Sequence, residues 1–208
     1  MSSLQENNLS AEAALHVLKE GNQRFISGNN THIRQTPEQR QELAKGQHPF
    51  AVILACSDSR VPVEQIFDQP AGSIFVVRVA GNIAAPTQIG SIEFALTQFD
   101  SPLIIVMGHT NCGGIQSAID VIMNPQQPLS PNLRAITDRI IPSIEPMVKS
   151  LDHNHRKELV ANAVKENVRV AVKHLQHNSA TIEERIRHNQ VCILGAEFSQ
   201  ATGKVQFL

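Results

Sequence analysis

The sequence has no tryptophan, no tyrosine and only three cysteines among its 208 residues. Eight phenylalanines would have to supply any stacking on bases, and 18 lysines and arginines stand against 19 acidic residues. We therefore expect no nucleic-acid partner. Three cysteines are too few, and odd in number, for a disulfide framework, so we expect the reducing environment of the cytoplasm.

Long apolar runs are also missing. No stretch reaches the ~18 consecutive apolar residues of a membrane span, and we expect no membrane partner. Residues 1–8 are polar and lack the basic and apolar segments of a signal peptide. A hydrophobic fraction of 41% and a charged fraction of 18% are ordinary for a globular protein. The chain is therefore long and apolar enough to fold around one sizeable core.

Apolar runs alternate with helical periodicity in the middle of the chain, which predicts an α/β fold. We expect four buried strands in a mainly parallel sheet, at 50–55, 74–79, 103–107 and 191–197. Helices are expected between them at 87–99 and 113–123. The turn Thr202-Gly203-Lys204 leads into a short run at 205–208, which predicts an antiparallel edge strand.

Helices are also predicted to flank this sheet. Ser10 can cap a helix over 10–27, and Thr36, Pro37 and Gln39 form a capping-box pattern for a second helix that ends before Gly46. A proline-containing loop is expected at 124–135. A long helical stretch over 132–177, interrupted near Pro142 and Pro146, and a short helix over 181–187 should follow.

We expect a single domain over 1–208 with four parts. These are an N-terminal helical arm at 1–46, an α/β core with the metal site at 50–123, a helical segment at 124–190 and a strand hairpin at 191–208. No internal repeat or low-complexity tract divides the chain.

Two predicted strands are followed directly by residue types that commonly bind metals. The run at 50–55 is followed by Cys56-Ser57-Asp58-Ser59-Arg60, and the run at 103–107 by Gly108-His109-Thr110-Asn111-Cys112. In open α/β sheets, sites form beyond the carboxyl ends of the strands. If these two strands are neighbours, Cys56, His109 and Cys112 converge. Two thiolates and one imidazole suit zinc, with Zn–S near ~2.3 Å.

Three protein ligands leave the fourth tetrahedral position open, which is typical of a catalytic zinc. Asp58 could instead occupy that position and close the site. Arg60, two residues further on, can form a bidentate pair with Asp58 and hold it away from the metal. We therefore interpret Asp58 as a group with two positions and Asp58 with Arg60 as the candidate catalytic pair.

Each feature alone has an ordinary explanation. A cysteine at an apolar strand is usually a small buried residue, which is how we interpret Cys192. An Asp58–Arg60 pair alone would be a structural ion pair. Two alternatives stay open: a zinc closed permanently by Asp58 in an interaction protein, and a covalent nucleophile at Cys56. A nucleophilic Cys56 would remain active under chelation and fail on alkylation.

The two cysteine-containing segments resemble the paired signature motifs of the β-class carbonic anhydrases. Further segments along most of the chain also resemble that family: Gly21-Asn22-Gln23-Arg24-Phe25, Phe75-Val76-Val77-Arg78, Ala80-Gly81-Asn82, Gly195-Ala196-Glu197 and Thr202-Gly203-Lys204. The resemblance implies zinc-dependent, reversible hydration of carbon dioxide to bicarbonate and a proton. The attacking group would be a zinc-bound hydroxide.

The resemblance also assigns roles and an assembly. It implies one Zn²⁺ per chain, with Cys56, His109 and Cys112 as permanent ligands. Asp58 would be the fourth ligand in a closed, inactive form, or the partner of Arg60 in the open form. The family implies a homodimer, often paired into tetramers, whose N-terminal helix reaches across to the partner and whose active site lies at the interface.

The expected pocket for carbon dioxide is carried over residue by residue. Gln47 matches a glutamine that the family takes from the neighbouring subunit, and Phe75 matches a phenylalanine. Phe94 stands where plant-type members have tyrosine, so a hydroxyl is missing. Gly113, next to Cys112, lets the backbone come close to a bound anion.

One branch of the family has a tryptophan that forms an inhibitory bicarbonate site. Ile53 occupies that position here, so we predict no such pocket, although Arg78 matches the arginine of that site. A close relative could hydrolyse CS2 or COS by the same chemistry. The sequence leaves that alternative open.

Overall fold

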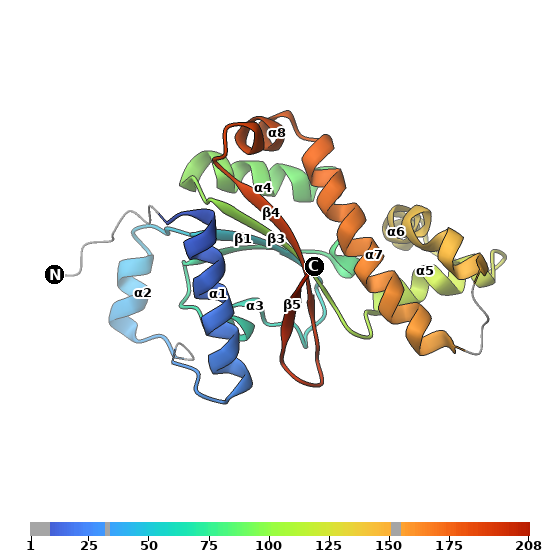
Figure 1. Ribbon diagram of the computed structural model, residues 1–208, viewed down its shortest axis with the longest axis horizontal. Helices are drawn as coiled ribbons and strands as arrows, with labels where there is room; N and C mark the ends of the chain where they lie inside the picture. Colours follow the sequence, from blue (N-terminus) through green and yellow to red (C-terminus); the bar gives the residue numbers. More distant parts are fainter. Residues whose placement is uncertain (1–8, 32–33, 151–154) are drawn as a thin grey trace.

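The computed structural model describes residues 9–31, 34–150 and 155–208. Its centre is a five-stranded sheet with the order β2-β1-β3-β4-β5 (Figure 1). Four strands run parallel and β5 pairs antiparallel with β4. The strands are β1 (Ala51–Ala55), β2 (Ile74–Arg78), β3 (Leu103–His109), β4 (Cys192–Phe198) and β5 (Val205–Phe207). The predicted α/β fold with an antiparallel edge strand is confirmed.

The central strands are continuous apolar runs because helices cover both faces of the sheet. Every residue of β1 and β3 is buried. β3 extends two residues beyond the predicted run, because Gly108 and His109 continue the ladder opposite Glu197 and Phe198 of β4. The strand therefore carries His109 itself.

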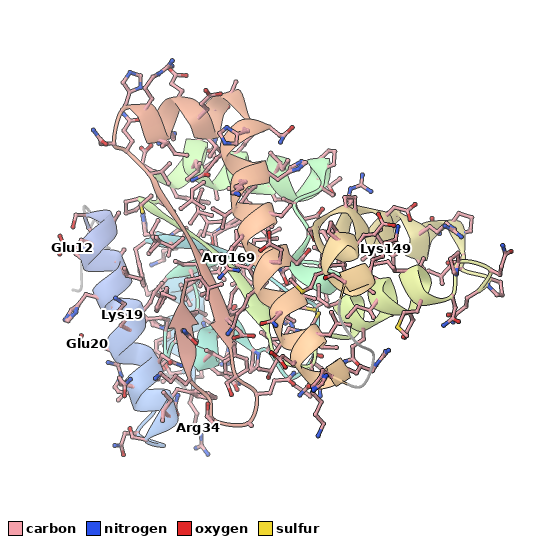
Figure 2. All side chains as sticks on the ribbon, turned by 45° about the vertical axis from the view of Figure 1, so that its right-hand side comes forward. Glu12, Lys19, Glu20, Arg34, Lys149 and Arg169 are labelled. Carbon is pink, nitrogen blue, oxygen red and sulfur yellow. The ribbon has the colours of Figure 1, made fainter. Side chains whose placement is uncertain are left out.

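Different helices pack on the two faces of the sheet. One face holds α1 (Ala11–Ile26) and α3 (Val63–Ile66), and the other holds α4 (Pro86–Phe99), α7 (Arg156–His177) and α8 (Ala180–Arg187). α1 shows why such helices form. Ala14 and Leu18 are buried against the sheet, whereas Glu12 and Glu20 lie on the outer side of the helix (Figure 2).

The predicted helix caps are present. Ser10 Oγ accepts a hydrogen bond from the backbone N–H of Ala13 at 3.1 Å, which starts α1. Thr36 and Gln39 form the reciprocal capping box of α2 (Pro37–Leu43). These local hydrogen bonds define the start of both helices without any tertiary contact.

A second helical layer lies beyond one end of the sheet, where α5 (Gly113–Met123) and α6 (Pro131–Ser150) lie side by side (Figure 1). The predicted interruption near Pro142 and Pro146 is wrong, because both prolines lie inside the continuous α6. The buried face of α6, with Ile140 and Ile144, packs on α5 and offsets the lost backbone hydrogen bonds.

α6 ends at Ser150, and α7 begins at Arg156. The part of the predicted 132–177 helix at 151–154 lies outside the described residues, as does the polar segment 1–8. Among the helices that the structure describes, none combines the length and apolar character needed to cross a membrane.

Candidate metal centre

The three predicted metal ligands meet at the carboxyl ends of β1 and β3. These strands are parallel neighbours, with Ala55 opposite Met107, so the residues that follow come side by side. Cys112 is the N-cap residue of α5 and turns back toward β1. The ligand atoms of Cys56, His109 and Cys112 all lie within 4.8 Å of one another, and all three residues are buried.

This donor set fits a tetrahedral zinc. The sulfurs of Cys56 and Cys112 lie 3.9 Å apart. Two thiolates on one tetrahedral zinc would be separated by about 3.8 Å. His109 Nε2 is buried and has no hydrogen-bond partner among the described residues. A buried ring nitrogen without a partner is costly unless a ligand occupies it, so it points to a metal.

The other ring nitrogen of His109 fixes the tautomer that zinc requires. Nδ1 lies 3.0 Å from the backbone oxygen of Thr110, and only a protonated Nδ1 can donate to that carbonyl. The Nε2 lone pair is then free for the metal. Ligating histidines usually have such an outer hydrogen bond, which also orients the ring.

The two cysteines share one hydrogen bond even without a metal. Donation from Cys112 to the sulfur of Cys56 lowers the pKa of Cys56 to about 4, and the same bond together with burial raises the pKa of Cys112. One thiolate is therefore favoured next to one thiol. A coordinated metal ion deprotonates a thiol outright, so zinc would replace the shared proton.

A tight turn that follows β2 supports the first thiolate. The backbone N–H of Gly81 donates to Cys56 Sγ at 3.4 Å, and Gly81 has a φ of 71° that favours glycine. Asn167 of α7 donates from Nδ2 to the Gly81 carbonyl at 2.9 Å and holds the turn in place. Sequence patterns assigned no role to Gly81 or Asn167, and only the family resemblance of Ala80-Gly81-Asn82 pointed to this turn.

Asp58 and Arg60 form the bidentate pair that the sequence suggested. Arg60 Nε donates to Asp58 Oδ1 at 2.9 Å and Arg60 Nη2 to Oδ2 at 2.7 Å. The backbone N–H of Arg60 adds a third bond to Oδ1 at 2.9 Å. These bonds, led by the Arg60 side chain, hold the pKa of Asp58 well below its usual range. Asp58 Oδ2 also lies 3.9 Å from His109 Nε2, beside the ligand cluster.

Arg78 fixes the loop that carries the first ligand and the carboxylate. Its Nε donates to the backbone oxygen of Cys56 at 3.0 Å, and its Nη2 donates to that of Asp58 at 2.6 Å. The sequence noted Arg78 only for its likeness to a bicarbonate site. The structure uses its guanidinium to hold two backbone carbonyls at the end of β1.

The expected pocket residues occupy several places. Gly113 adjoins Cys112 at the start of α5, with open space where a side chain would point. Gln47 precedes β1, at the opposite end of that strand from Cys56, and lines a surface hollow of about 420 Å³. Phe75 and Phe94 pack together, with ring centroids 6.2 Å apart, on β2 and α4. One chain therefore places Asp58, Arg60 and Gly113 beside the three metal ligands. The other expected pocket residues, Gln47, Phe75 and Phe94, lie elsewhere in the chain.

The sequence is similar to known proteins over nearly its whole length. The family described as carbonic anhydrase matches residues 51–205. Carbonic anhydrase 2 of Mycobacterium tuberculosis is 37% identical over 197 residues, which cover 95% of this chain and 92% of the relative. A carbonic anhydrase of Mycolicibacterium smegmatis is 35% identical over 199 residues, covering 96% of this chain and 94% of the relative.

Solved structures share the same architecture. One from a study of two tetrameric β-carbonic anhydrases of Sordaria macrospora has a TM-score of 0.74 and 26% identity, and the match covers 94% of this chain and 96% of that one. The β-carbonic anhydrase CafA of Aspergillus fumigatus has a TM-score of 0.72 and 26% identity, covering 95% of this chain and 89% of that one.

Proposed function

Because this chain belongs to the β-class carbonic anhydrases, zinc enzymes that hydrate carbon dioxide to bicarbonate, we propose roles for the residues of its metal centre. Cys56, His109 and Cys112 hold the zinc, and Asp58 with Arg60 forms the catalytic pair. The observation that carries this proposal is the convergence of three ligand atoms within 4.8 Å beside a carboxylate held by an arginine.

Each protein group has a distinct part in this proposal. When bound, zinc acts as a Lewis acid that makes a water molecule nucleophilic near neutral pH. The cysteine thiolates and neutral His109 bind the ion, and Asp58, kept ionised by Arg60, can only accept hydrogen bonds. Its Oδ2, next to the ligand cluster, accepts from the attacking water and so orients it toward carbon dioxide.

The same pair argues against a zinc closed permanently by Asp58. Arg60 engages both carboxylate oxygens of Asp58, at 2.9 and 2.7 Å, and so competes with the metal for them. Asp58 as a fourth ligand would have to give up these bonds. The open arrangement therefore supports catalysis rather than a purely structural ion.

We further propose that the substrate pocket is completed in a homodimer. Gln47 lies before the start of β1 whereas Cys56 follows its end, so Gln47 is assigned to the partner's site. β2 is an edge strand of the described sheet, and beside it Phe94 is 53% exposed although it packs against Phe75 and Phe99. An edge strand next to an exposed aromatic ring is a suitable surface for a second copy. Tetramers, as described for the Sordaria enzymes, would pair such dimers.

The proposed compartment is the cytoplasm. Cys56, Cys112 and Cys192 are all free thiols, and two of them belong to the metal centre. A reducing environment keeps such thiols available for zinc.

The experiment that tests the catalytic pair uses the variant Asp58→Asn. The matched control is Asp138→Asn, because Asp138 is exposed on α6. Stopped-flow hydration of carbon dioxide and zinc content are measured on the same samples. Asp58→Asn should lose at least about 100-fold in kcat/KM, since its amide has one acceptor oxygen where the carboxylate uses two, and it should keep one zinc per chain. Wild-type turnover in this variant, or loss of its zinc, would contradict the assignment.

A further inference from the structure

The loop that follows β4 passes beside the metal centre. The backbone N–H of Gln200 donates to Thr110 Oγ1 at 3.1 Å, and the backbone N–H of Thr110 donates to the Phe198 carbonyl at 3.0 Å. Thr110 follows the ligand His109 directly. These two bonds tie the loop after β4 to the end of β3, and they bring the half-buried side chain of Gln200 to the outer side of the His109 ring.

The side-chain amide of Gln200 has one orientation that satisfies all its neighbours. Its nitrogen then donates to the Thr110 carbonyl at 2.9 Å, and its oxygen accepts from His109 Nδ1 at 3.2 Å and from Arg60 Nε at 3.1 Å. The opposite orientation would place the oxygen against an acceptor and the nitrogen against donors. The hydrogen-bond network therefore determines the orientation of the amide.

The side-chain oxygen of Gln200 therefore contacts both His109 and Arg60. His109 Nδ1 is the outer nitrogen of a metal ligand, and Arg60 Nε also binds Asp58 Oδ1 at 2.9 Å. We propose that Gln200 is a positioning residue that couples the zinc ligand His109 to the Asp58–Arg60 pair. It acts through these neighbours and does not itself touch the substrate.

The coupling has two physical effects. First, Gln200 is a second acceptor for the Nδ1–H of His109, beside the Thr110 carbonyl, and so strengthens the tautomer and ring orientation that leave Nε2 for zinc. Second, it shares the single Nε–H of Arg60 with Asp58 Oδ1, which holds the guanidinium beside the carboxylate. Both effects depend on the neutral side-chain oxygen of Gln200. One variant can therefore remove this oxygen, and another can give the group a negative charge.

The first test removes the oxygen. Gln200→Leu keeps the approximate length of the side chain, and Gln206→Leu on the exposed side of β5 is the matched control. Zinc affinity is measured by chelator competition. Gln200→Leu should weaken it about tenfold or more, as outer-shell changes commonly do, and should lower kcat with little change in KM. Gln206→Leu should match the wild type. Equal zinc affinity and kcat in both variants would overturn the proposal.

The NMR chemical shift of the His109 Nδ1 proton reports directly on its hydrogen bond to Gln200. A change in overall stability alone would leave this shift unaltered. In the zinc-loaded protein labelled with ¹⁵N-histidine, this proton should resonate upfield in Gln200→Leu relative to wild type and Gln206→Leu, because it loses an acceptor. An unchanged resonance would show that Gln200 does not bind this ring. Neither this signal nor the zinc affinity depends on turnover, so a failure of the catalytic pair proposed above would be recognised separately.

Gln200→Glu separates the two contacts. Its carboxylate still accepts from His109 but lacks the amide donor to the Thr110 carbonyl, so zinc affinity should fall less than in Gln200→Leu. The added negative charge competes with Asp58 for Arg60, so kcat should still fall. If zinc affinity falls as far as in Gln200→Leu, or if kcat equals that of the wild type, the coupling through Arg60 and His109 is wrong.

Discussion

The sulfurs of Cys56 and Cys112 lie 3.9 Å apart although 56 positions separate them in the chain. Parallel pairing of β1 with β3 brings the two strand ends together, and the N-terminus of α5 then returns Cys112 to Cys56. The spacing between the sulfurs is therefore a consequence of sheet topology. It leads directly to a prediction about metal retention.

Cys112→Ser should lose its zinc. A serine hydroxyl stays protonated near neutral pH and is a poor zinc ligand, and the two remaining ligands cannot hold the ion in a stable site. The measurement is the zinc-to-protein ratio after gel filtration in the presence of a weak chelator. Cys192→Ser on β4 is the control and should keep one zinc per chain. Stoichiometric zinc in Cys112→Ser would exclude Cys112 as a ligand.

A mixed dimer tests the shared pocket. Gln47→Ala and Asp58→Asn should each be nearly inactive, since each spoils both sites of its homodimer. In a heterodimer of the two variants, one site carries both changes and the other carries neither. Random mixing by co-expression should therefore restore about a quarter of the wild-type activity. No recovery, despite heterodimers seen by native mass spectrometry, would show that Gln47 acts within its own chain. Wild-type activity of Gln47→Ala alone would remove Gln47 from the pocket.

Asn22→Ala should destabilise the whole chain. The buried Asn22 side chain donates to the carbonyls of Ile66 and Gly203 at 3.1 and 2.8 Å and accepts from the backbone N–H of Val205 at 2.9 Å. It thereby joins α1 to α3 and to the β4–β5 hairpin. Its loss leaves buried backbone groups without partners, at a cost of about 3 kcal/mol in the free energy of unfolding.

Urea unfolding measures that change, and the neighbouring Gln23→Ala is the control because Gln23 is exposed on the same turn of α1. The control should stay within about 0.5 kcal/mol of the wild type. Equal midpoints for the two variants would mean that the Asn22 bonds add nothing to stability.

Much of the fold follows from local sequence patterns. Ser10 and Thr36 start their helices through their own side chains, and the apolar runs form strands because helices bury them on both faces. The candidate ligands were also predictable. Cys56 and His109 stand at strand ends, and strand ends in a parallel sheet meet at one edge.

Other features depended on tertiary packing. Pro142 and Pro146 predicted a break, yet α6 continues through both because its apolar face packs on α5. His109 belongs to β3 because its ladder partner is Phe198, a residue far along the chain. A local pattern does not reveal these outcomes, since their stabilisation comes from residues distant in sequence.

The sequence by itself determined which atoms could bind the metal and which carboxylate and guanidinium could pair, since these depend on residue type and short spacing. Only the tertiary structure decided what supports them. Gly81, Arg78 and Gln200 reach the centre from other strand ends, and no spacing in the sequence connects them to it. Their hydrogen bonds form only when the sheet aligns those ends, so the outer contacts of the site are a property of the fold.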